Sequence, residues 1–399
     1  MSINKKLQIL FMACLGACSS GVHAQWQQCA GTAGQNVHCL AMKDSMLFAG
    51  TDSGIFFSAD TGNTWTLRST GITADTVLAL LITGSNVFAG THGGGIFHTI
   101  NNGLTWQAAN NGITNNVVHC FMESGTQIFA GADNGEIFLS VDSGLNWSLL
   151  STGITQTPVN ALAGSGTEIF AAHNFGIFVS ADSGTSWTTT GITVTNFISF
   201  AVHDSEIYAG SGGDGVFYTA DNFVTWSINN NGMSNLIIES LVVSDSDVFA
   251  ASSGNGVYVS TDHAANWATF NAGLTDLFVH ALATGSGYVF AGTLSDGVWR
   301  RVITEVTSAE DNLTATGDEL KIFPNPVSDN LTVESRMGGT AAASEKKYLS
   351  ICNSLGQKMI RKSFSAQKYS VNISGFPKGV YFIEVRTEKA VMKKIVVKM

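Results

Sequence analysis

The chain has 399 residues, and Asp and Glu outnumber Lys and Arg by 30 to 20, which gives a formal net charge of −10. Charged residues make up only 13% of the chain, Gly is abundant with 43 copies and Pro is scarce with 4. This composition is typical of tight-turned β-structure rather than disorder. The acidic balance excludes nucleic acid as the main partner, because phosphate binding requires clustered Lys and Arg.

The N-terminus has the pattern of an export signal. Two lysines precede an apolar run from Leu7 to Cys18, and small residues follow up to Ala24. These are the three parts of a secretory signal peptide, so we expect residues 1–24 to be removed. The apolar run is too short to span a bilayer stably, and we expect no transmembrane span. Leu15-Gly16-Ala17-Cys18 also resembles a lipoprotein box, so acylation of Cys18 stays open as the alternative.

Residues 25–303 carry a repeat with a period near 40. A box of the form Ser/Thr-x-Asp/Asn-x-Gly-x-x-Trp first spans Ser58 to Trp65, and later tryptophans follow at intervals of 41, 41, 40, 39 and 41 residues. A fixed period of this length indicates one supersecondary unit used repeatedly. The box residues are Asp60, Gly62, Trp65, Asn101, Gly103, Trp106, Asp142, Gly144, Trp147, Asp182, Gly184, Trp187, Asp221, Trp226, Asp262 and Trp267. The last two copies have Phe223 and Ala264 in place of the glycine, so we expect irregular turns there.

Each repeat predicts four short strands. In the unit that begins at Val77, three apolar segments alternate with clusters of Gly, Asn, Asp and Ser, and a fourth strand carries Trp106. An aromatic landmark on the second strand occurs seven times, from Phe48 to Phe290. The seventh unit lacks a fourth strand, and we expect a strand at residues 26–29 to complete it. An N-terminal strand in that place closes a ring and removes a sheet edge.

The box resembles the Asp-box, or BNR, repeat of sialidases and related propellers. The resemblance implies an all-β fold, a seven-bladed β-propeller of four-stranded blades closed by the N-terminal strand. We interpret the box as structural, because the Asp carboxylate accepts hydrogen bonds from turn amides, Gly allows the tight bend and Trp packs between sheets.

Catalysis of the sialidase type requires three arginines that converge on the substrate carboxylate. The repeat region offers only Arg68, Arg300 and Arg301. Two of them are adjacent and therefore point to opposite faces of a strand. We expect no sialidase activity, no other enzymatic activity and no catalytic residue.

Candidate binding residues lie at one end of the predicted blades. One position on the first strand of each repeat lines the expected central channel, and its polar members of interest are His38, His119, Glu239 and His280. The acidic residues of the adjoining short turns are Asp52, Asp133, Asp214 and Asp296. We interpret both groups as satisfied channel-lining residues and hairpin turn residues. A metal site of consecutive His and Glu residues is the alternative, although we expect neither a bound metal nor a cofactor.

Four cysteines follow the leader, and we expect no disulfide among them. Cys39 and Cys120 occupy a first-strand position where other repeats have Ala, so they read as small buried hydrophobic residues. Cys29 lies on an outer strand, about 14 Å from an inner one. That separation is too large for a disulfide.

The C-terminal part of the chain differs in charge from the repeats. Residues 304–318 are polar and acidic and indicate an exposed linker. Residues 319–399 are rich in Lys, and seven or so short alternating strands predict a small β-sandwich.

This segment resembles the type A C-terminal sorting domain of the type IX secretion system. The matching pieces are Pro324-Asn325-Pro326, Asn353-x-Leu355-Gly356, Pro377-x-Gly379-x-Tyr381 and the basic terminal strand. The resemblance implies export through the periplasm and the outer membrane, with the type IX machinery and its surface protease as partners. The protein would be secreted or held at the outer cell surface.

These features predict an exported propeller that binds an unidentified glycan or protein ligand. A minimal glycoside hydrolase or lyase is one alternative, with Asp214 and Asp296 as candidates for the carboxylate pair that such an enzyme requires. A purely structural surface or adhesion protein is the other.

Overall fold

The computed structural model describes residues 25–74, 76–150, 154, 157–192, 196–221, 225–303, 319–324, 327–336, 347–353, 358–386 and 391–398. The expected leader and linker, together with Phe223, Asn325, Pro326 and Gly356, lie outside the described residues. The chain separates into two compact units, Met1–Ile303 and Thr304–Met399. Within the described ranges, no helix has the length and apolar character that crossing a membrane requires.

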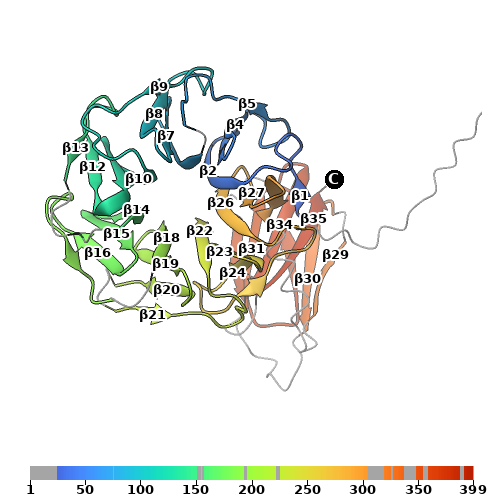
Figure 1. Cartoon of the computed structure of the whole chain (residues 1–399). Coiled ribbons are helices and arrows are strands. Elements are labelled where there is room, and N and C mark those ends of the chain that lie inside the picture. Colours follow the sequence, from blue (N-terminus) through green and yellow to red (C-terminus); the bar gives the residue numbers. More distant parts are fainter. Residues whose placement is uncertain are drawn as a thin grey trace, which may run out of the picture. The chain divides into compact units, whose positions relative to one another are not determined.

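The described part of the first unit consists of seven four-stranded antiparallel sheets that follow one another around a ring (Figure 1). Sheets 1 to 6 are β2–β5, β6–β9, β10–β13, β14–β17, β18–β21 and β22–β25, and sheet 7 is β26–β28 together with β1. The innermost strand of each sheet contacts the innermost strand of the next, and β26 contacts β2, so the series of sheets is closed.

The strands of the seven sheets have nearly constant lengths. The innermost strands are β2 (Val37–Lys43), β6 (Val77–Thr83), β10 (Val118–Ser124), β14 (Val159–Ser165), β18 (Phe197–His203), β22 (Ile238–Ser244) and β26 (Val279–Gly285). The second strands are β3 (Met46–Thr51), β7 (Asn86–Thr91), β11 (Gln127–Ala132), β15 (Glu168–His173), β19 (Glu206–Ser211), β23 (Asp247–Ser252) and β27 (Tyr288–Thr293). The third strands are β4 (Gly54–Ser58), β8 (Ile96–Thr99), β12 (Ile137–Ser140), β16 (Gly176–Ser180), β20 (Val216–Thr219), β24 (Gly256–Ser260) and β28 (Val298–Val302). The outer strands are β5 (Thr66–Leu67), β9 (Gln107–Ala108), β13 (Ser148–Leu149), β17 (Thr188–Thr189), β21 (Ser227–Ile228), β25 (Ala268–Thr269) and β1 (Gln27–Gln28).

The outer strands are shorter than the repeat pattern predicts. The box tryptophan precedes the outer strand instead of lying on it, as Trp106 does before β9. A short 3-10 turn, Asp133–Gly135, joins β11 to β12.

The apolar core lies between neighbouring sheets. Phe48 and Ile55 of sheet 1, for example, pack with Val77, Val87 and Trp106 of sheet 2. The aromatic landmark of each second strand is almost completely buried; these residues are Phe48, Phe88, Phe129, Phe170, Tyr208, Phe249 and Phe290. Full burial of one such side chain contributes about 2 kcal/mol, so sheet-to-sheet packing stabilises the ring as a whole.

The N-terminal segment completes sheet 7. Gln27 pairs with Arg300, and Gln28 with Trp299, in the register of an antiparallel strand. The indole N–H of the buried Trp26 donates to the carbonyl oxygen of Phe270, and the guanidinium of Arg301 lies 3.6 Å from the centre of the Phe270 ring. This is the pairing that the position of Trp26 predicts.

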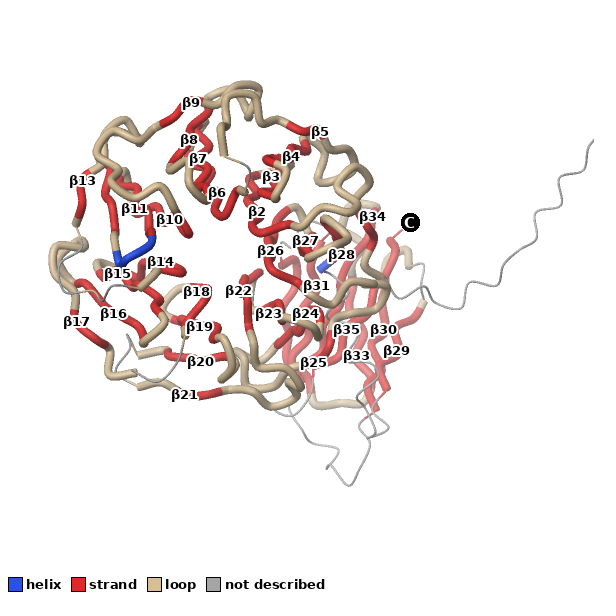
Figure 2. Tube along the Cα trace, viewed as in Figure 1, coloured by secondary structure: helices blue, strands red, loops and turns tan. Residues whose placement is uncertain are grey.

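The two ends of the sheets carry different connections, which the tan segments of Figure 2 trace. We call the end with the first-to-second-strand turns and the box turns the box edge. The opposite end, with the second-to-third-strand turns and the loops to the next sheet, is the loop edge. The backbone N–H of Thr61 in a box turn donates to the carbonyl of Ser45 in a first-to-second-strand turn, which confirms that both turns share one edge.

The second unit contains two antiparallel sheets, in the orders β29-β30-β33 and β32-β31-β34-β35. Their strands are β29 (Glu319–Phe323), β30 (Asn330–Arg336), β31 (Lys347–Asn353), β32 (Lys358–Phe364), β33 (Lys368–Asn372), β34 (Gly379–Arg386) and β35 (Val391–Lys398). Both sheets contribute to one buried apolar cluster, which includes Leu331 and Val333 from the first sheet and Leu349, Ile351 and Ile383 from the second.

Candidate functional site

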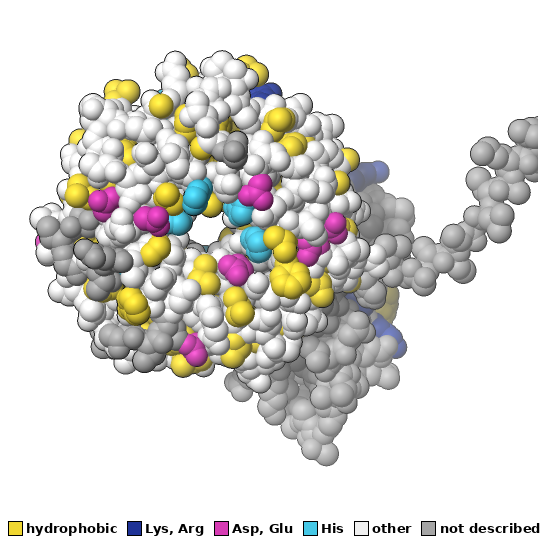
Figure 3. All heavy atoms as spheres, in the orientation of Figure 1, with side chains coloured by type: hydrophobic (Ala, Val, Ile, Leu, Met, Phe, Trp, Pro, Cys, Tyr) yellow, Lys and Arg dark blue, Asp and Glu magenta, His cyan; other side chains and the backbone are white. Residues whose placement is uncertain are grey.

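The sequence-predicted column is the second residue of every innermost strand. Its members are His38, Leu78, His119, Asn160, Ile198, Glu239 and His280. The residue before each is apolar and completely buried, and the strand register shifts directly after it. The buried residue and the shift hold the column at the loop edge. Figure 3 shows histidine and carboxylate side chains gathered around the central opening of this unit.

Three polar column residues find a partner fourteen positions later, in the next turn of their own sheet. His38 Nε2 lies 2.6 Å from Asp52 Oδ1, and His119 Nε2 lies 2.7 Å from Asp133 Oδ1. The amide of Asn160 donates to Asn174 Oδ1 at 3.0 Å. The hydrogen bond from His38 holds the pKa of the Asp52 carboxyl below its ordinary value. These side chains have therefore used part of their hydrogen-bonding capacity within the fold.

Glu239 and His280 differ from the other polar column residues. The turn positions fourteen residues later are Ser253 and Leu294, and neither Glu239 nor His280 has a hydrogen-bond partner among the described residues. The His280 ring stacks on the His38 ring with centroids 6.3 Å apart. Burial lowers the pKa of His280, and the nearby Glu239 charge opposes that shift. Glu239 of sheet 6 and His280 of sheet 7 are thus half-buried polar groups without a hydrogen-bond partner among the described residues, and they lie beside the hydrogen-bonded His38 of sheet 1.

Exposed apolar side chains adjoin this polar cluster, and sequence reasoning missed them. Ile237 is 39% exposed, Phe278 is 47% exposed and Leu294 is 40% exposed. The backbone N–H of Leu294 donates to the carbonyl of Phe278 at 3.0 Å, so these two residues are neighbours. Ile237 and Phe278 stand two residues before Glu239 and His280. The apolar character of this position in sheets 6 and 7 was visible in the sequence, but its exposure was not.

The predicted acidic turn residues lie at the loop edge, and their environments differ. Asp296 accepts a hydrogen bond from Thr275 Oγ1 at 2.8 Å, whereas Asp214 is exposed. Asp214 belongs to sheet 5 and Asp296 to sheet 7, with sheet 6 between them. A further carboxylate, Asp276, escaped prediction; its oxygens accept hydrogen bonds from the backbone of Phe278 and from Ser295. Within the described ranges, no three His, Cys, Asp or Glu side chains are grouped so that they could hold a metal ion.

The Asp boxes form a repeated hydrogen-bonded turn at the box edge. In the first copy, Asp60 Oδ1 accepts from the backbone N–H of Thr64 at 2.8 Å and from Ser58 Oγ at 2.8 Å. These bonds, led by the backbone bond from Thr64, lower the pKa of Asp60 to about 2. The same backbone acceptance recurs at Asn101, Asp142, Asp182, Asp221 and Asp262.

The box turns of sheets 1, 3 and 4 also pack on the preceding sheet. A methyl group added to Gly62 or Gly184 would lie 3.2 Å from the Phe290 ring or 3.5 Å from the Phe129 ring, and one added to Gly144 would overlap Phe88. The glycine therefore permits a close approach as well as a tight bend.

The expectation of an irregular turn at Ala264 was wrong. Ala264 has a φ of 63°, and its backbone N–H donates to Ser260 Oγ at 2.9 Å, as the glycines of the regular boxes do to the equivalent Ser or Thr. Asp262 Oδ1 accepts a hydrogen bond from the backbone N–H of Asn266, and this bond holds the turn in its regular shape although Ala264 carries a Cβ in the left-handed region.

The three arginines serve structural contacts. Arg68 donates to the carbonyl of Asn102 at 2.6 Å, Arg300 donates to the carbonyl of Thr61 at 2.7 Å, and Arg301 is buried against Phe270. The described cysteines Cys29, Cys39, Cys120 and Cys352 are free thiols. Burial raises the pKa of Cys29 to about 11 and those of Cys39 and Cys120 to about 12.

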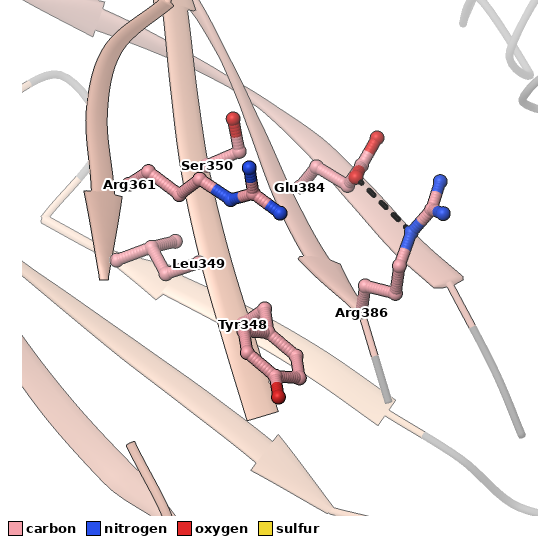
Figure 4. A pocket seen from close by; sticks show the side chains of 6 residues that line it. All are labelled: Tyr348, Leu349, Ser350, Arg361, Glu384 and Arg386. Atoms are coloured by element: carbon pink, nitrogen blue, oxygen red, sulfur yellow. Dashed lines mark ion pairs between the residues drawn. The ribbon is translucent and has the colours of Figure 1, made fainter. Parts of the chain in front are cut away.

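In the second unit, Tyr381 of the predicted motif is buried, and its hydroxyl donates to the carbonyl of Pro377 at 2.8 Å. Pro324 follows β29 and Gly379 begins β34. A cavity of about 280 Å³ lies over β31, β32 and β34, where Tyr348, Arg361, Glu384 and Arg386 line it (Figure 4). Glu384 and Arg386 form an ion pair across 3.6 Å, so part of the charge in this cavity is already neutralised.

The tail matches a known family model, described as the secretion system C-terminal sorting domain, over residues 321–398. No curated protein matches the chain. The type IX secretion tail implies export to the cell surface or the medium.

Solved structures similar to this chain include PorZ, a surface component of the type IX secretion system of Porphyromonas gingivalis, at 15% identity and a TM-score of 0.56. That match covers 91% of this chain and 59% of PorZ. A WD40 β-propeller domain matches at 12% identity and a TM-score of 0.58, over 70% of this chain and 96% of the domain. A xyloglucanase from Xanthomonas campestris matches at 13% identity and a TM-score of 0.57, over 78% of this chain and 59% of the enzyme. At these identities the likeness shows the fold alone, which is a β-propeller.

Proposed function

We propose that this chain is an exported, seven-bladed Asp-box propeller whose work is binding, with its ligand at the central opening of the loop edge. The site is centred on Glu239, His280 and His38. The observation that carries the proposal is a difference within the column. His38, His119 and Asn160 are each hydrogen-bonded to a residue in the next turn of their own sheet, whereas Glu239 and His280 have no hydrogen-bond partner among the described residues. Half-buried polar groups without partners favour a ligand that supplies them.

The adjoining apolar side chains support the same location. Ile237, Phe278 and Leu294 are large and exposed, and each lies directly next to a strand of sheet 6 or sheet 7. A few polar groups set among exposed apolar ones are typical of a recognition surface, since the apolar area supplies affinity and the polar groups supply orientation.

We further propose that the protein is not an enzyme. Arg68, Arg300 and Arg301 are engaged in separate structural contacts, which argues against a convergent arginine triad. Asp214 and Asp296 belong to sheets separated by a third, which argues against a glycosidase pair of adjacent carboxylates. The two sheets of the tail are proposed to form a β-sandwich that the type IX machinery reads and its surface protease removes, with the leader removed beforehand.

A pair of arrays tests the binding function. The purified secreted protein is applied to a glycan array and to a peptide array, together with E239Q/H280A and a matched control, H119A/D133N, which alters a satisfied column pair. The proposal predicts signals that the first variant loses and the control keeps. Signals that persist in both E239Q/H280A and H119A/D133N would show that the ligand binds elsewhere. Turnover of a glycan would show that the protein is an enzyme.

A further inference from the structure

The charges of the ring-forming unit are distributed unequally between its two edges. Residues 25–303 contain four basic residues, Lys43, Arg68, Arg300 and Arg301. Lys43 donates to the carbonyl of Gly84 in a first-to-second-strand turn, and Arg68 and Arg300 donate to box turns, so these three lie at the box edge. Arg301 is buried against Phe270. Within the described ranges, the loop edge therefore presents no Lys or Arg side chain.

Carboxylates gather at that same loop edge. They are Asp52, Asp133, Glu136, Asp214, Glu239, Asp276 and Asp296. Most of them accept hydrogen bonds from neighbouring side chains or backbone, which fixes their charge in place. Because like charges there are not balanced by basic side chains, the opening should hold a negative potential that attracts cations and repels phosphate, sulfate and uronate groups.

Glu239 is the carboxylate of this set that lies within the column without a partner. Its neighbours on sheet 7 and sheet 1 are His280 and His38, whose rings stack on each other. Ile237 and Phe278, two residues before Glu239 and His280, and Leu294, which is bonded to Phe278, are all exposed. The surface thus offers a negative charge that has no hydrogen-bond partner among the described residues, on the same edge and the same two sheets as an apolar patch.

We propose that this surface docks a basic and apolar segment of another protein, with a Lys or Arg side chain paired to Glu239 and an apolar side chain on Phe278 and Leu294. This inference rests on the proposed binding site and names its ligand class. Charge complementarity selects a cationic partner, and the exposed aliphatic Ile237 and Leu294 offer apolar contact to the side chains of a peptide. The long stem of Lys or Arg can lie along apolar surface while its charged end reaches Glu239.

The test measures fluorescence anisotropy of labelled peptides with the full secreted chain. The probe peptide alternates Lys or Arg with Leu or Phe; one control peptide replaces every basic residue by Gln and another replaces it by Glu. The basic peptide should bind, the Gln peptide should bind at least about tenfold more weakly, and the Glu peptide should not bind. Added salt should weaken the binding of the basic peptide, because the interaction is largely between partly exposed charges.

Substitutions locate the contact. E239Q should weaken the binding of the basic peptide about fivefold, which is the effect expected from the loss of a single partly exposed ion pair. D133N, at a satisfied carboxylate of the same edge, should change it less than about twofold. F278A should weaken both the basic and the Gln peptides. Because Glu239 has no hydrogen-bond partner among the described residues, E239Q should leave the melting temperature unchanged, which separates a lost contact from a lost fold.

The outcomes distinguish the two proposals. If the Gln or Glu peptide, or a neutral glycan, binds as well as the basic peptide and depends on Glu239 and Phe278, the site is correct and the cationic class is wrong. If the basic peptide binds with no dependence on Glu239, the docking surface is wrong. If no peptide and no glycan binds at this edge, both the inference and the proposed function fail.

Discussion

Gly144 in the box turn of sheet 3 lies directly against the ring of Phe88 in sheet 2, so closely that a Cβ on the glycine would overlap Cε1 of the ring. The equivalent contacts of Gly62, Gly103 and Gly184 reach Phe290, Phe48 and Phe129, each in the preceding sheet. In sheets 1 to 4 the box therefore links each sheet to the one before it, which explains why the glycine recurs in these repeats.

Gly144→Ala should destabilise the protein by about 3 kcal/mol, because the new methyl meets Phe88 and the residue has a φ of +81°. Gly166→Ala is the matched control, since Gly166 also has a positive φ, +61°, but has open space around it. The control should cost about 1 kcal/mol. Denaturant unfolding measures both; equal losses would show that backbone conformation alone, and not contact with Phe88, sets the requirement for glycine.

Ring closure depends on Trp26. Trp26→Ala removes a buried indole, its hydrogen bond to the Phe270 carbonyl and its edge contact with the Phe270 ring. We expect a loss of about 3 kcal/mol in unfolding free energy and faster proteolysis near the N-terminus. Gln27→Ala, on the exposed strand β1, should cost less than about 0.5 kcal/mol. Two equally small losses would mean that the N-terminal strand does not hold the ring closed.

Buried His173 should make the protein less stable in mild acid. Burial lowers the pKa of His173 to about 4, below the value near 6.5 of an exposed histidine. Above pH 6.5 neither state binds a proton there, and between pH 6.5 and 4 only the unfolded state does. Stability should therefore fall by about 2 kcal/mol between pH 7 and pH 4.5.

Threonine occupies the position of His173 in sheets 1, 2 and 7, where its hydroxyl donates to a turn carbonyl. His173→Thr should therefore flatten the pH dependence, whereas the exposed His92→Thr should leave it unchanged. Urea unfolding at pH 7 and pH 4.5 makes the comparison. An unaltered slope in His173→Thr would assign the acid sensitivity to other groups.

Thiol reactivity should separate the two units. Cys29 is buried and Cys39, Cys120 and Cys352 are half-buried as residues, but desolvation raises the pKa of the Cys29 thiol to about 11 and those of the Cys39 and Cys120 thiols to about 12. Iodoacetamide reacts with the thiolate, so native protein should be labelled at Cys352 alone and urea-unfolded protein at all four. After removal of the tail the native protein should take no label. Rapid labelling of Cys39 or Cys120 would contradict the packing of the innermost strands.

Much of the fold follows from local patterns. The positions of the first three strands of each sheet, the N-terminal strand of sheet 7 and the column from His38 to His280 are predicted by periodicity. The length of the outer strands is not, because two residues carry no alternation. The glycines that follow the outer strands also went unnoticed, although Gly71 and Gly112 recur before Ile; a Cβ at either would overlap the backbone carbonyl of Trp106 or Trp147 in the next sheet.

The position of the candidate site could be predicted from the sequence, but which of its polar residues have hydrogen-bond partners could not. The pattern treats His119, Glu239 and His280 alike, because all three hold the same strand position. Which of them has a partner depends on the residue fourteen positions later, and on the turn that brings it back. Exposure of Phe278 depends in addition on its neighbours at the loop edge. These are tertiary properties that composition and spacing do not contain.

The most direct measurement of the central claim is hydrogen exchange of the full secreted chain, with and without a saturating basic, apolar peptide. The account predicts added protection in the segments that start β22 and β26, around Ile237–Glu239 and Phe278–His280, and unchanged exchange in the Asp-box turns. Protection at the box edge, or no change in exchange anywhere at saturating peptide, would contradict it.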